Sequence, residues 1–248
     1  MLLAVVPTTA AAVDCTPLGT LHDAHVRYVI DGDTVILDGG RHIRIVGLNA
    51  PEIAHDGEAA QPFAAAARLR LTHWLATAGN HVEWSAAPDR RDRYGRTLAH
   101  VYIGGQDAAR RLLEAGLAAV IAIPPNVRRS ACYRAAEQIA RTHHRGLWST
   151  GSGVVRSVAE AAQPGFEIVR GRVASVAEKR AGTLLTLHGG LTVWIAADDR
   201  HYFRHPLKRL SGRTILVRGW QYAYHGRPEI IVHHPAALTV VGEPVGAR

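Results

Sequence analysis

Short runs of β-branched and other apolar residues, separated by turn residues, dominate the first half of the chain, and this pattern predicts β-strands. Asp38-Gly39-Gly40 joins two of these runs as a hairpin turn. Apolar residues at helical spacing follow Gln61-Pro62, where proline is tolerated in the first turn of a helix. We expect strands at 24–30, 34–37, 42–46, 81–85 and 98–103, and helices at 63–76, 107–114 and 127–145. This order fits a five-stranded barrel of the OB type packed with helices.

The second half of the chain returns to a strand-rich pattern after a change in composition. Thr150–Gly165 is rich in serine, glycine and alanine and lacks periodicity, which is typical of a linker. Strands are then expected at 167–176, 183–187, 191–195, 214–220 and 229–232, with a partly helical insertion, Asp198–Leu210, after the third. This predicts a second small OB-like barrel and an α+β protein made mainly of β-strands. The expected division is an N-terminal extension at 1–22, a first barrel at 23–149, a linker at 150–165, a second barrel at 166–242 and a tail at 243–248.

The charge of the chain indicates a polyanionic partner. The 248 residues carry a net charge of +8, and the pI is near 10.1. No run of eighteen apolar residues is present, so no membrane-spanning helix is expected. The apolar N-terminus ends in small side chains but lacks a positive start, so it resembles a signal peptide whose beginning is trimmed. We therefore expect an exported protein, periplasmic or secreted, or a cytoplasmic one if this segment is not a signal remnant.

Two cysteines, Cys15 and Cys132, are compatible with one disulfide in an oxidising compartment. Such a disulfide would tie the N-terminal extension to the last helix of the first barrel. Two unrelated free thiols are the alternative.

Three polar clusters interrupt the strands of the first barrel. They are Asp31-Gly32-Asp33-Thr34, Arg44 followed by Asn49-Ala50-Pro51-Glu52, and Asp92-Arg93-Tyr94-Gly95-Arg96. Asp31 and Asp33 are two residues apart and face the same side of an extended chain. Hard cations such as Ca²⁺ take carboxylate, amide and carbonyl oxygens, which Asp33, Asn49 and Ala50 can supply. Taken alone, Asp-Gly-Asp is more often a turn capped by its own aspartate side chains.

The two arginines in these clusters fit a phosphate. Arg44 lies in a strand whose neighbours, Ile43 and Ile45, should face the core, and Arg96 lies at the entry to another strand. Each arginine alone is more simply an exposed strand or turn charge. Two guanidinium groups on one phosphate would stabilise the extra charge of a pentacoordinate transition state.

In their order and strand context, the three clusters resemble the staphylococcal-nuclease-like (thermonuclease) family. The resemblance covers roughly Val26–Ser149 and includes Arg145-Gly146-Leu147-Trp148-Ser149 at the end of the last helix. It implies a five-stranded OB barrel with three helices and a Ca²⁺-dependent phosphodiesterase.

The resemblance also implies a role for each matching side chain. Glu52 corresponds to the carboxylate that orients or deprotonates the attacking water. Arg44 and Arg96 correspond to the two arginines that bind the reacting phosphate. Arg93 and Tyr94 match residues that contact a neighbouring phosphate.

The metal ligands implied by the resemblance are Asp33, Asn49 and the backbone of Ala50, with Asp31 as a second acid near the metal. The family has an aspartate where this chain has Asn49. An amide oxygen can still bind Ca²⁺, but the site loses a unit of negative charge. We therefore expect the affinity for Ca²⁺ to fall.

Aromatic residues that can stack on bases are unevenly placed. Family members commonly carry tyrosines near the phosphate and base, but the corresponding segment, Leu117–Pro124, has none. In the second barrel, Tyr222, Tyr224 and Arg227 are candidate contacts to nucleic acid, the alternative being a structural or protein-binding module. Two tryptophans in apolar strands are expected in the core instead, namely Trp194 and Trp220.

We expect a nuclease, acting as a monomer, that uses Ca²⁺ to hydrolyse DNA, RNA or both. The alternative is a weakened or inactive nucleic-acid-binding protein that keeps the barrel and its arginines, which Asn49 and the missing tyrosines favour. Glu52 favours the enzyme, because a pure binding protein has no need of a water-activating carboxylate. A barrel pair that binds another protein at the cell envelope is a third alternative.

Overall fold

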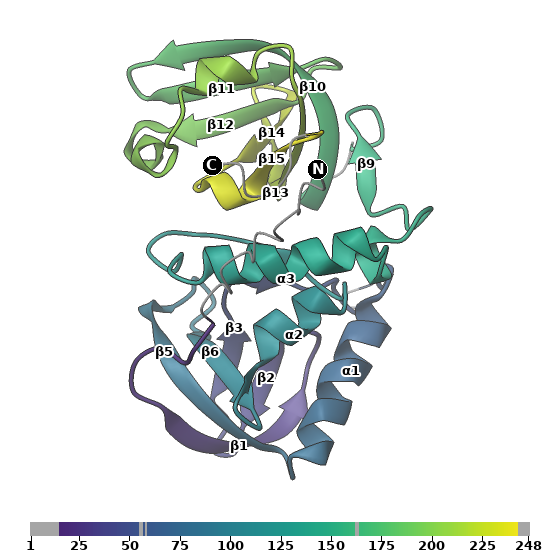
Figure 1. Ribbon diagram of the computed structural model, residues 1–248, viewed down its shortest axis with the longest axis vertical. Helices are drawn as coiled ribbons and strands as arrows, with labels where there is room; N and C mark the ends of the chain where they lie inside the picture. The colour runs from purple at the N-terminus through teal and green to yellow at the C-terminus, as the bar shows by residue number, and fades with distance from the viewer. Residues whose placement is uncertain (1–14, 55–56, 58, 162–163, 243–248) are drawn as a thin grey trace, which may run out of the picture.

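The computed structural model describes residues 15–54, 57, 59–161 and 164–242. Within these residues the chain forms two closed five-stranded barrels (Figure 1). The expected α+β fold, with an OB-type barrel followed by a second barrel, is confirmed.

The first barrel closes through its third and fifth strands. It contains β1 (His22–Val29), β2 (Thr34–Leu37), β3 (His42–Ile45), β5 (His81–Arg91) and β6 (Thr97–Ile103). The strand order is β3-β2-β1-β5-β6, and a parallel pairing of β3 with β6 closes the sheet. This closure places Arg44 of β3 beside Leu98 of β6.

Three helices pack on or beside the first barrel. In α1 (Ala64–Thr77), Leu71 and Leu75 are buried against the core. The next helix, α2 (Ala108–Glu114), begins after Asp107, whose carboxylate accepts a hydrogen bond from the Arg110 backbone N–H at 3.0 Å. The third, α3 (Ser130–Thr142), lies between the two barrels (Figure 1).

Three two-residue strands are additions to the expected elements of the first barrel. They are β4 (Leu48–Asn49), β7 (Gln106–Asp107) and β8 (Ala119–Val120). In the antiparallel pair β4–β8, Asn49 lies opposite Ala119. A strand of two residues is too short to show alternation in the sequence.

The second barrel repeats the topology of the first. It contains β10 (Gly165–Lys179), β11 (Gly182–Leu187), β12 (Thr192–Ala196), β13 (Thr214–Tyr224) and β14 (Arg227–Ile231). Here too the third and fifth strands, β12 and β14, pair in parallel, and β10 pairs with β13 to close the barrel. The helical insertion expected after the third strand consists of η2 (Ala197–Tyr202) and η3 (Leu207–Leu210).

Smaller elements flank the second barrel. The strand β9 (Val155–Ser157) lies in the segment expected as a linker and pairs in parallel with β10. At the other edge, β15 (Leu238–Val240) pairs with β13, and the short helix η4 (Pro235–Ala237) precedes it. A further short helix, η1 (Gly146–Trp148), follows α3.

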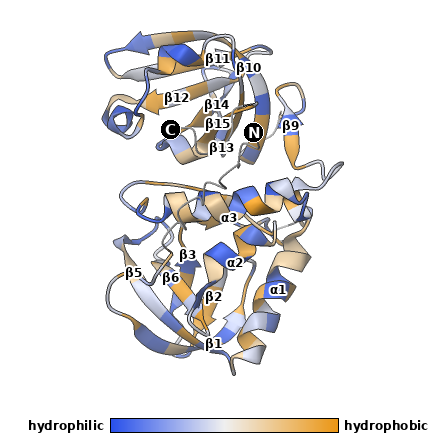
Figure 2. Cartoon of the chain, viewed as in Figure 1, coloured by the Kyte–Doolittle hydropathy of each residue, from blue (hydrophilic) through white to orange (hydrophobic). Residues whose placement is uncertain are grey.

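Each barrel encloses its own apolar core. Strand β12, for example, is apolar along most of its length (Figure 2), and its Val193 and Ile195 are fully buried. A third apolar cluster joins the barrels and includes Leu147 from the first domain and Ile168 and Leu216 from the second. The two barrels therefore share a packed interface.

A buried ion network crosses the same interface. Glu137 of α3 accepts a hydrogen bond from Arg218 Nη1 of β13 at 2.7 Å (to Oε1) and pairs with Arg141 at 2.6 Å. Its other carboxylate oxygen accepts the Val120 backbone N–H at 2.7 Å. Burial opposes ionisation of Glu137, but the guanidinium groups of Arg218 and Arg141 hold the pKa of this carboxyl below its ordinary value.

A disulfide joins Cys15 to Cys132 at the start of α3, the pair that the sequence suggested. Arg129, immediately before α3, donates a hydrogen bond to the Cys15 carbonyl at 2.9 Å. The segment before β1 is thereby attached to α3 by a covalent bond and a hydrogen bond.

Trp220 is not a core residue, contrary to the expectation from its apolar strand. Its relative exposure is 45%. In β13 the inward positions are the odd-numbered ones, such as Val217, so Trp220 lies on the outer face of the barrel. Trp194 is partly buried.

Candidate active site

The first polar cluster forms a tight turn against α1. The Asp33 backbone N–H donates to Asp31 Oδ1 at 2.8 Å, as in a turn capped by an aspartate. Position 32 requires glycine, because an added Cβ would lie 2.7 Å from the Cβ atoms of both Ala50 and Ala67. The Asp31 side chain therefore caps this turn, and the close packing at Gly32 holds Asp33 next to Ala50.

Asp33 is the buried centre of the site. Its Oδ2 accepts the Ala50 backbone N–H at 2.7 Å and pairs with Arg44 Nη2 at 3.0 Å, while Oδ1 accepts from the Thr34 hydroxyl at 3.0 Å. Burial raises the pKa of the Asp33 carboxyl to about 7, and Arg44 opposes this rise. The nearby carboxylates of Asp31 and Glu52 raise this pKa further.

Arg44 is held in a fixed orientation. Its Nη1 donates to the backbone carbonyls of Ile45 at 2.8 Å and Leu48 at 3.0 Å. Its Nη2 donates to Asn49 Oδ1 at 3.0 Å, in addition to its pairing with Asp33. The arginine that sequence analysis placed on the outer side of β3 is thus buried, with four protein acceptors for its terminal nitrogens.

Asn49 contributes a neutral oxygen to this cluster. It is 5% exposed, and its position is fixed by the pairing of β4 with β8. Its Nδ2 donates to the Ala50 carbonyl at 3.4 Å. Asn49 and Ala50 therefore lie beside Asp33, as the expected ligand set requires.

The donor set of this cluster fits a hard cation. Asp31, Asp33, Asn49 and Ala50 offer only oxygen atoms, the ligands that Ca²⁺ prefers. The pKa of Asp33 is raised mainly by burial and further by the carboxylates of Asp31 and Glu52, and one guanidinium does not fully compensate for these effects. Among the residues that the structure describes, no group of three or more His, Cys, Asp or Glu side chains forms a metal cluster, so the amide and carbonyl oxygens would be needed.

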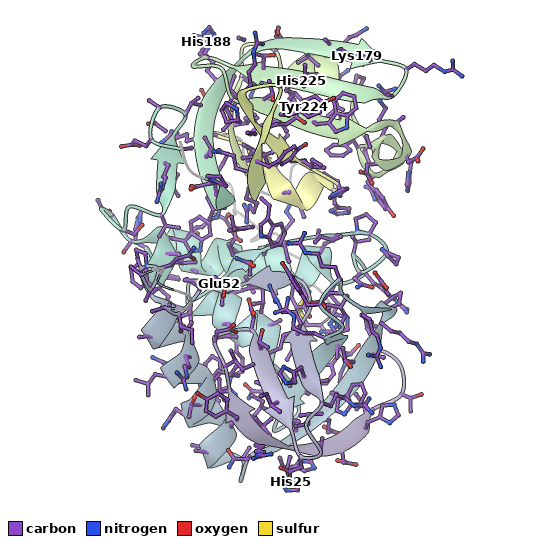
Figure 3. The ribbon with its side chains drawn as sticks, turned by 180° about the vertical axis from the view of Figure 1, so that it is seen from behind. His25, Glu52, Lys179, His188, Tyr224 and His225 are labelled. Atoms are coloured by element: carbon purple, nitrogen blue, oxygen red, sulfur yellow. A yellow bond between two sulfur atoms is a disulfide. The ribbon has the colours of Figure 1, made fainter. Side chains whose placement is uncertain are left out.

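Glu52 lies on the loop that follows this cluster, and Gln61 fixes its backbone. The Glu52 N–H donates to Gln61 Oε1 at 3.0 Å, and the Gln61 N–H donates to the Glu52 carbonyl at 2.9 Å. Figure 3 shows Glu52 in the part of the first barrel nearest to the second barrel. In the sequence, Gln61 marks only the start of a helix, because a contact across nine residues of loop leaves no local signal.

The third cluster is a turn organised by Asp92. Its carboxylate accepts from Arg96 Nε at 2.6 Å, from the Arg96 backbone N–H at 2.9 Å and from the Tyr94 backbone N–H at 2.9 Å. Burial opposes ionisation of Asp92, but these hydrogen bonds and the charge of Arg96 lower the pKa of the carboxyl. Asp92 therefore orients Arg96, a role that its place in the motif did not reveal.

Arg96 lies in the turn that leads into β6, next to the strand that carries Arg44. The parallel register pairs Arg44 with Leu98, and Arg96 precedes Leu98 by two residues. Arg93 donates to the Tyr94 hydroxyl at 2.6 Å, and Tyr94 is 68% exposed. The structure thus brings the first and second clusters into one site and places the third in the turn before the adjoining strand.

The candidate contacts in the second barrel form a separate group. Tyr222 and Tyr224 lie on β13, and Arg227 lies opposite Tyr224 at the start of β14. They are not part of the cluster around Asp33.

Comparisons with known proteins relate the first barrel to a nuclease family. A family model described as "Staphylococcal nuclease homologue" matches residues 42–150. The "Thermonuclease" of Staphylococcus intermedius is 31% identical over 126 residues, covering 50% of this chain and 74% of that protein. "Endonuclease YncB" of Bacillus subtilis is 34% identical over 124 residues, covering 48% of this chain and 58% of that protein.

Fungal proteins are also similar to this chain. "Probable endonuclease LCL3" of Paracoccidioides lutzii is 36% identical over 125 residues, which is 46% of this chain. The chain spans only 35% of the length of that relative.

No helix among the described residues is long and apolar enough to cross a membrane.

Proposed function

Because the chain belongs to the family of staphylococcal nuclease homologues, we propose that it is a nuclease that uses Ca²⁺ to hydrolyse phosphodiester bonds in DNA, RNA or both. The observation that carries the proposal is the buried cluster of Asp33, Arg44 and Asn49 with Glu52 on the adjoining loop. Attack of water on a phosphate requires a carboxylate to accept a proton, with a bound cation and a fixed guanidinium nearby to stabilise negative charge.

Asp33, Asn49 Oδ1 and the Ala50 carbonyl would hold the cation, with Asp31 as a second acid near it. When bound, Ca²⁺ supplies a Lewis acid and a template for the phosphate. The chain contributes the shape of this site through the Gly32 turn and the pairing of β4 with β8.

Arg96 binds the phosphate, and Arg44 stabilises the charge that develops on it. Arg44 is held by the Ile45 and Leu48 carbonyls, Asn49 and Asp33, so it contributes a fixed positive charge beside the phosphate without reorganising. Arg96 is oriented by Asp92 and has a side chain that is 30% exposed. A phosphate can reach Arg96 from solvent.

Glu52 accepts the proton of the attacking water. As the water oxygen forms its bond to phosphorus, the bond to the leaving oxygen breaks, the proton of the water passes to the Glu52 carboxylate, and the leaving oxygen takes up a proton from solvent. The two hydrogen bonds to Gln61 fix the loop backbone that carries this carboxylate.

The test uses the purified full chain with labelled single-stranded DNA, single-stranded RNA and duplex DNA, each with Ca²⁺ or with a chelator. We expect fragments to form with Ca²⁺ and none with the chelator. If no substrate is cut at any Ca²⁺ concentration, yet binding is salt-sensitive, the protein is the inactive nucleic-acid-binding alternative.

We also propose that the protein works in an oxidising compartment outside the cytoplasm. The Cys15–Cys132 disulfide supports this, because disulfides rarely persist in the cytosol. Protein isolated from its own cells under thiol-blocking conditions should lack free thiols. Two labelled cysteines would overturn this proposal.

A further inference from the structure

An aromatic stripe runs along the outer face of β13, away from the first barrel. Outward positions alternate along this strand, and two of them, Leu216 and Arg218, are covered by the first domain. The next three are Trp220, Tyr222 and Tyr224, which define the stripe. Alternate residues of a strand are about 7 Å apart, so three rings follow one another along the surface.

The two residues at the ends of the stripe, Trp220 and Tyr224, are accessible to a ligand. Trp220 is 45% exposed and Tyr224 is 54% exposed, and neither belongs to an apolar core cluster of the described residues. Phe166, opposite Trp220 on β10, packs edge-on against it with ring centroids 5.3 Å apart. Because Trp220 and Tyr224 add to neither core, the packing of the barrel does not explain these exposed rings.

Tyr222 is anchored between them. Its hydroxyl donates to Glu229 Oε1 at 2.7 Å, and the other oxygen of Glu229 accepts from the Thr192 hydroxyl at 3.0 Å. Glu229 itself is only 6% exposed. This carboxylate therefore holds the ring of Tyr222 in place while presenting little negative charge to solvent.

The charge around the stripe is that of a surface for polyanions. Residues 166–242 contain eleven arginine and lysine side chains against five carboxylates, a net charge of +6, most of the +8 of the whole chain. Arg227 lies opposite Tyr224 on β14 and Arg170 lies on the outer face of β10, and both are exposed. Of the nearby acids, Glu229 is buried and Glu167 pairs with Arg156 at 3.5 Å.

The stripe also starts at the interface that adjoins the active-site loop. Phe63 packs against both the core of the first barrel and the cluster between the barrels. It follows by two residues Gln61, which holds the backbone of Glu52. Figure 3 shows Glu52 in the part of the first barrel nearest to the second barrel, and Tyr224 in the part of the second barrel away from the first.

From these observations we propose that the outer face of β13, with Trp220, Tyr222, Tyr224 and Arg227, binds a single-stranded nucleic acid that extends from the active site. Every base has a face that can stack on an aromatic ring, so such a surface accepts any sequence, and the arginines contact the phosphates. A duplex keeps its bases stacked on each other and cannot use the rings. The inference rests on the proposed function only in that the bound strand is the substrate of the first barrel.

The experiment measures binding of labelled oligothymidine to the full chain with a chelator present, so that no cleavage occurs. One oligomer has about four nucleotides and the other about twenty, lengths below and above the span of one OB barrel. We expect Trp220→Ala and Tyr224→Ala each to weaken binding of the long oligomer about tenfold. For the short oligomer and for a duplex, the affinity of each variant should be within about twofold of that of wild type, because neither ligand stacks on the stripe.

Tyr28→Ala is the matched control, because Tyr28 is an equally exposed tyrosine on the first barrel, at 51%. It should bind the long oligomer like wild type. Circular dichroism and thermal unfolding show whether each variant is folded, and two independent stripe variants keep the test open if one fails to fold. Unchanged binding of the long oligomer by folded Trp220→Ala and Tyr224→Ala proteins would overturn the proposal, as would equal losses for duplex and single strand.

Cleavage separates this inference from the proposed function. If wild type cuts DNA but the stripe variants bind like wild type, the stripe proposal fails and the nuclease stands. If wild type cuts nothing but the stripe variants lose affinity for the long strand, the nuclease fails and the stripe stands.

Discussion

Asn49 decides the charge of the site at the scale of single residues. Its amide oxygen accepts from Arg44 at 3.0 Å, and an aspartate in that place would add a negative charge next to Asp33. We expect Asn49→Asp to lower the Ca²⁺ concentration for half-maximal cleavage by about tenfold, since carboxylates are stronger ligands for hard cations than amides.

The measurement is the cleavage rate of a single-stranded substrate as a function of Ca²⁺, with thermal unfolding in Ca²⁺ and in chelator as the control. The variant should also gain more thermal stability from Ca²⁺ than wild type does. A Ca²⁺ dependence identical to that of wild type would show that Asn49 does not face the cation.

His100 makes stability depend on pH. Its Nδ1 lies 2.9 Å from the Tyr133 hydroxyl, which itself donates to Asp107 at 3.1 Å, so His100 is the donor to Tyr133. Burial lowers the pKa of His100 to about 4, and the charge of Arg129 adds to this. As pH falls from 6.5 towards 4, His100 is therefore protonated in the unfolded chain but stays neutral in the folded protein. The free energy of unfolding decreases over that pH range.

His100 is expected to lower the free energy of unfolding by about 2 kcal/mol between pH 7.5 and pH 5. Urea unfolding of wild type and His100→Gln at both pH values measures it, because the other titrating groups cancel in the difference. The variant should show the smaller decrease in the free energy of unfolding. A decrease equal to that of wild type would contradict the prediction.

At the scale of elements, the main strands and helices of both barrels are predictable from the sequence because they carry enough residues for alternation or helical spacing to appear. The strands β4 and β8 are not, since two residues show no period, yet their pairing positions Asn49. Trp220 was misplaced because its strand is apolar on both faces where it meets the first domain. An interface between domains resembles a core in its composition.

The candidate site follows the same division. The motifs located Asp33, Arg44 and Glu52, which carry chemistry in short, recurring patterns. The residues that orient them, Gln61 and Asp92, act through contacts that only the folded chain creates. No local pattern distinguishes such residues from ordinary loop side chains.

The disulfide is the element-scale feature with the largest expected effect on stability. It closes a loop of 117 residues between the segment before β1 and α3. Removing it should lower the free energy of unfolding by about 2–5 kcal/mol. Urea unfolding with and without a reductant measures this, and a Cys15→Ser/Cys132→Ser variant, which a reductant cannot change, is the control. Equal stability of oxidised and reduced wild type would contradict the prediction.

At the scale of the whole molecule, two barrels of the same topology are joined through α3. The carboxylate of Glu137 connects them, because it binds Arg218 of the second barrel and the Val120 N–H of the first. Glu137 and Arg218 are each 3% exposed. We therefore expect the barrels to unfold in one transition.

Arg218→Ala should destabilise the protein by about 3–5 kcal/mol, because it leaves the Glu137 carboxylate buried with one partner fewer. Adding Glu137→Gln to this variant should recover part of the loss, since the uncompensated charge is then removed. Chemical unfolding of the single and double variants, with Arg170→Ala as an exposed arginine control, measures the coupling. Two separate transitions in wild type, or an Arg218→Ala protein as stable as wild type, would contradict the role of this network.

We propose that Glu52 activates water at a phosphate bound by the first barrel. The most direct measurement compares wild type and Glu52→Gln for cleavage of one single-stranded DNA at saturating Ca²⁺, with binding measured in parallel in a chelator. We predict that kcat falls by about a hundredfold or more, the usual contribution of a general base, while binding changes little. Equal cleavage rates for the two proteins, or no cleavage by wild type, would contradict the claim.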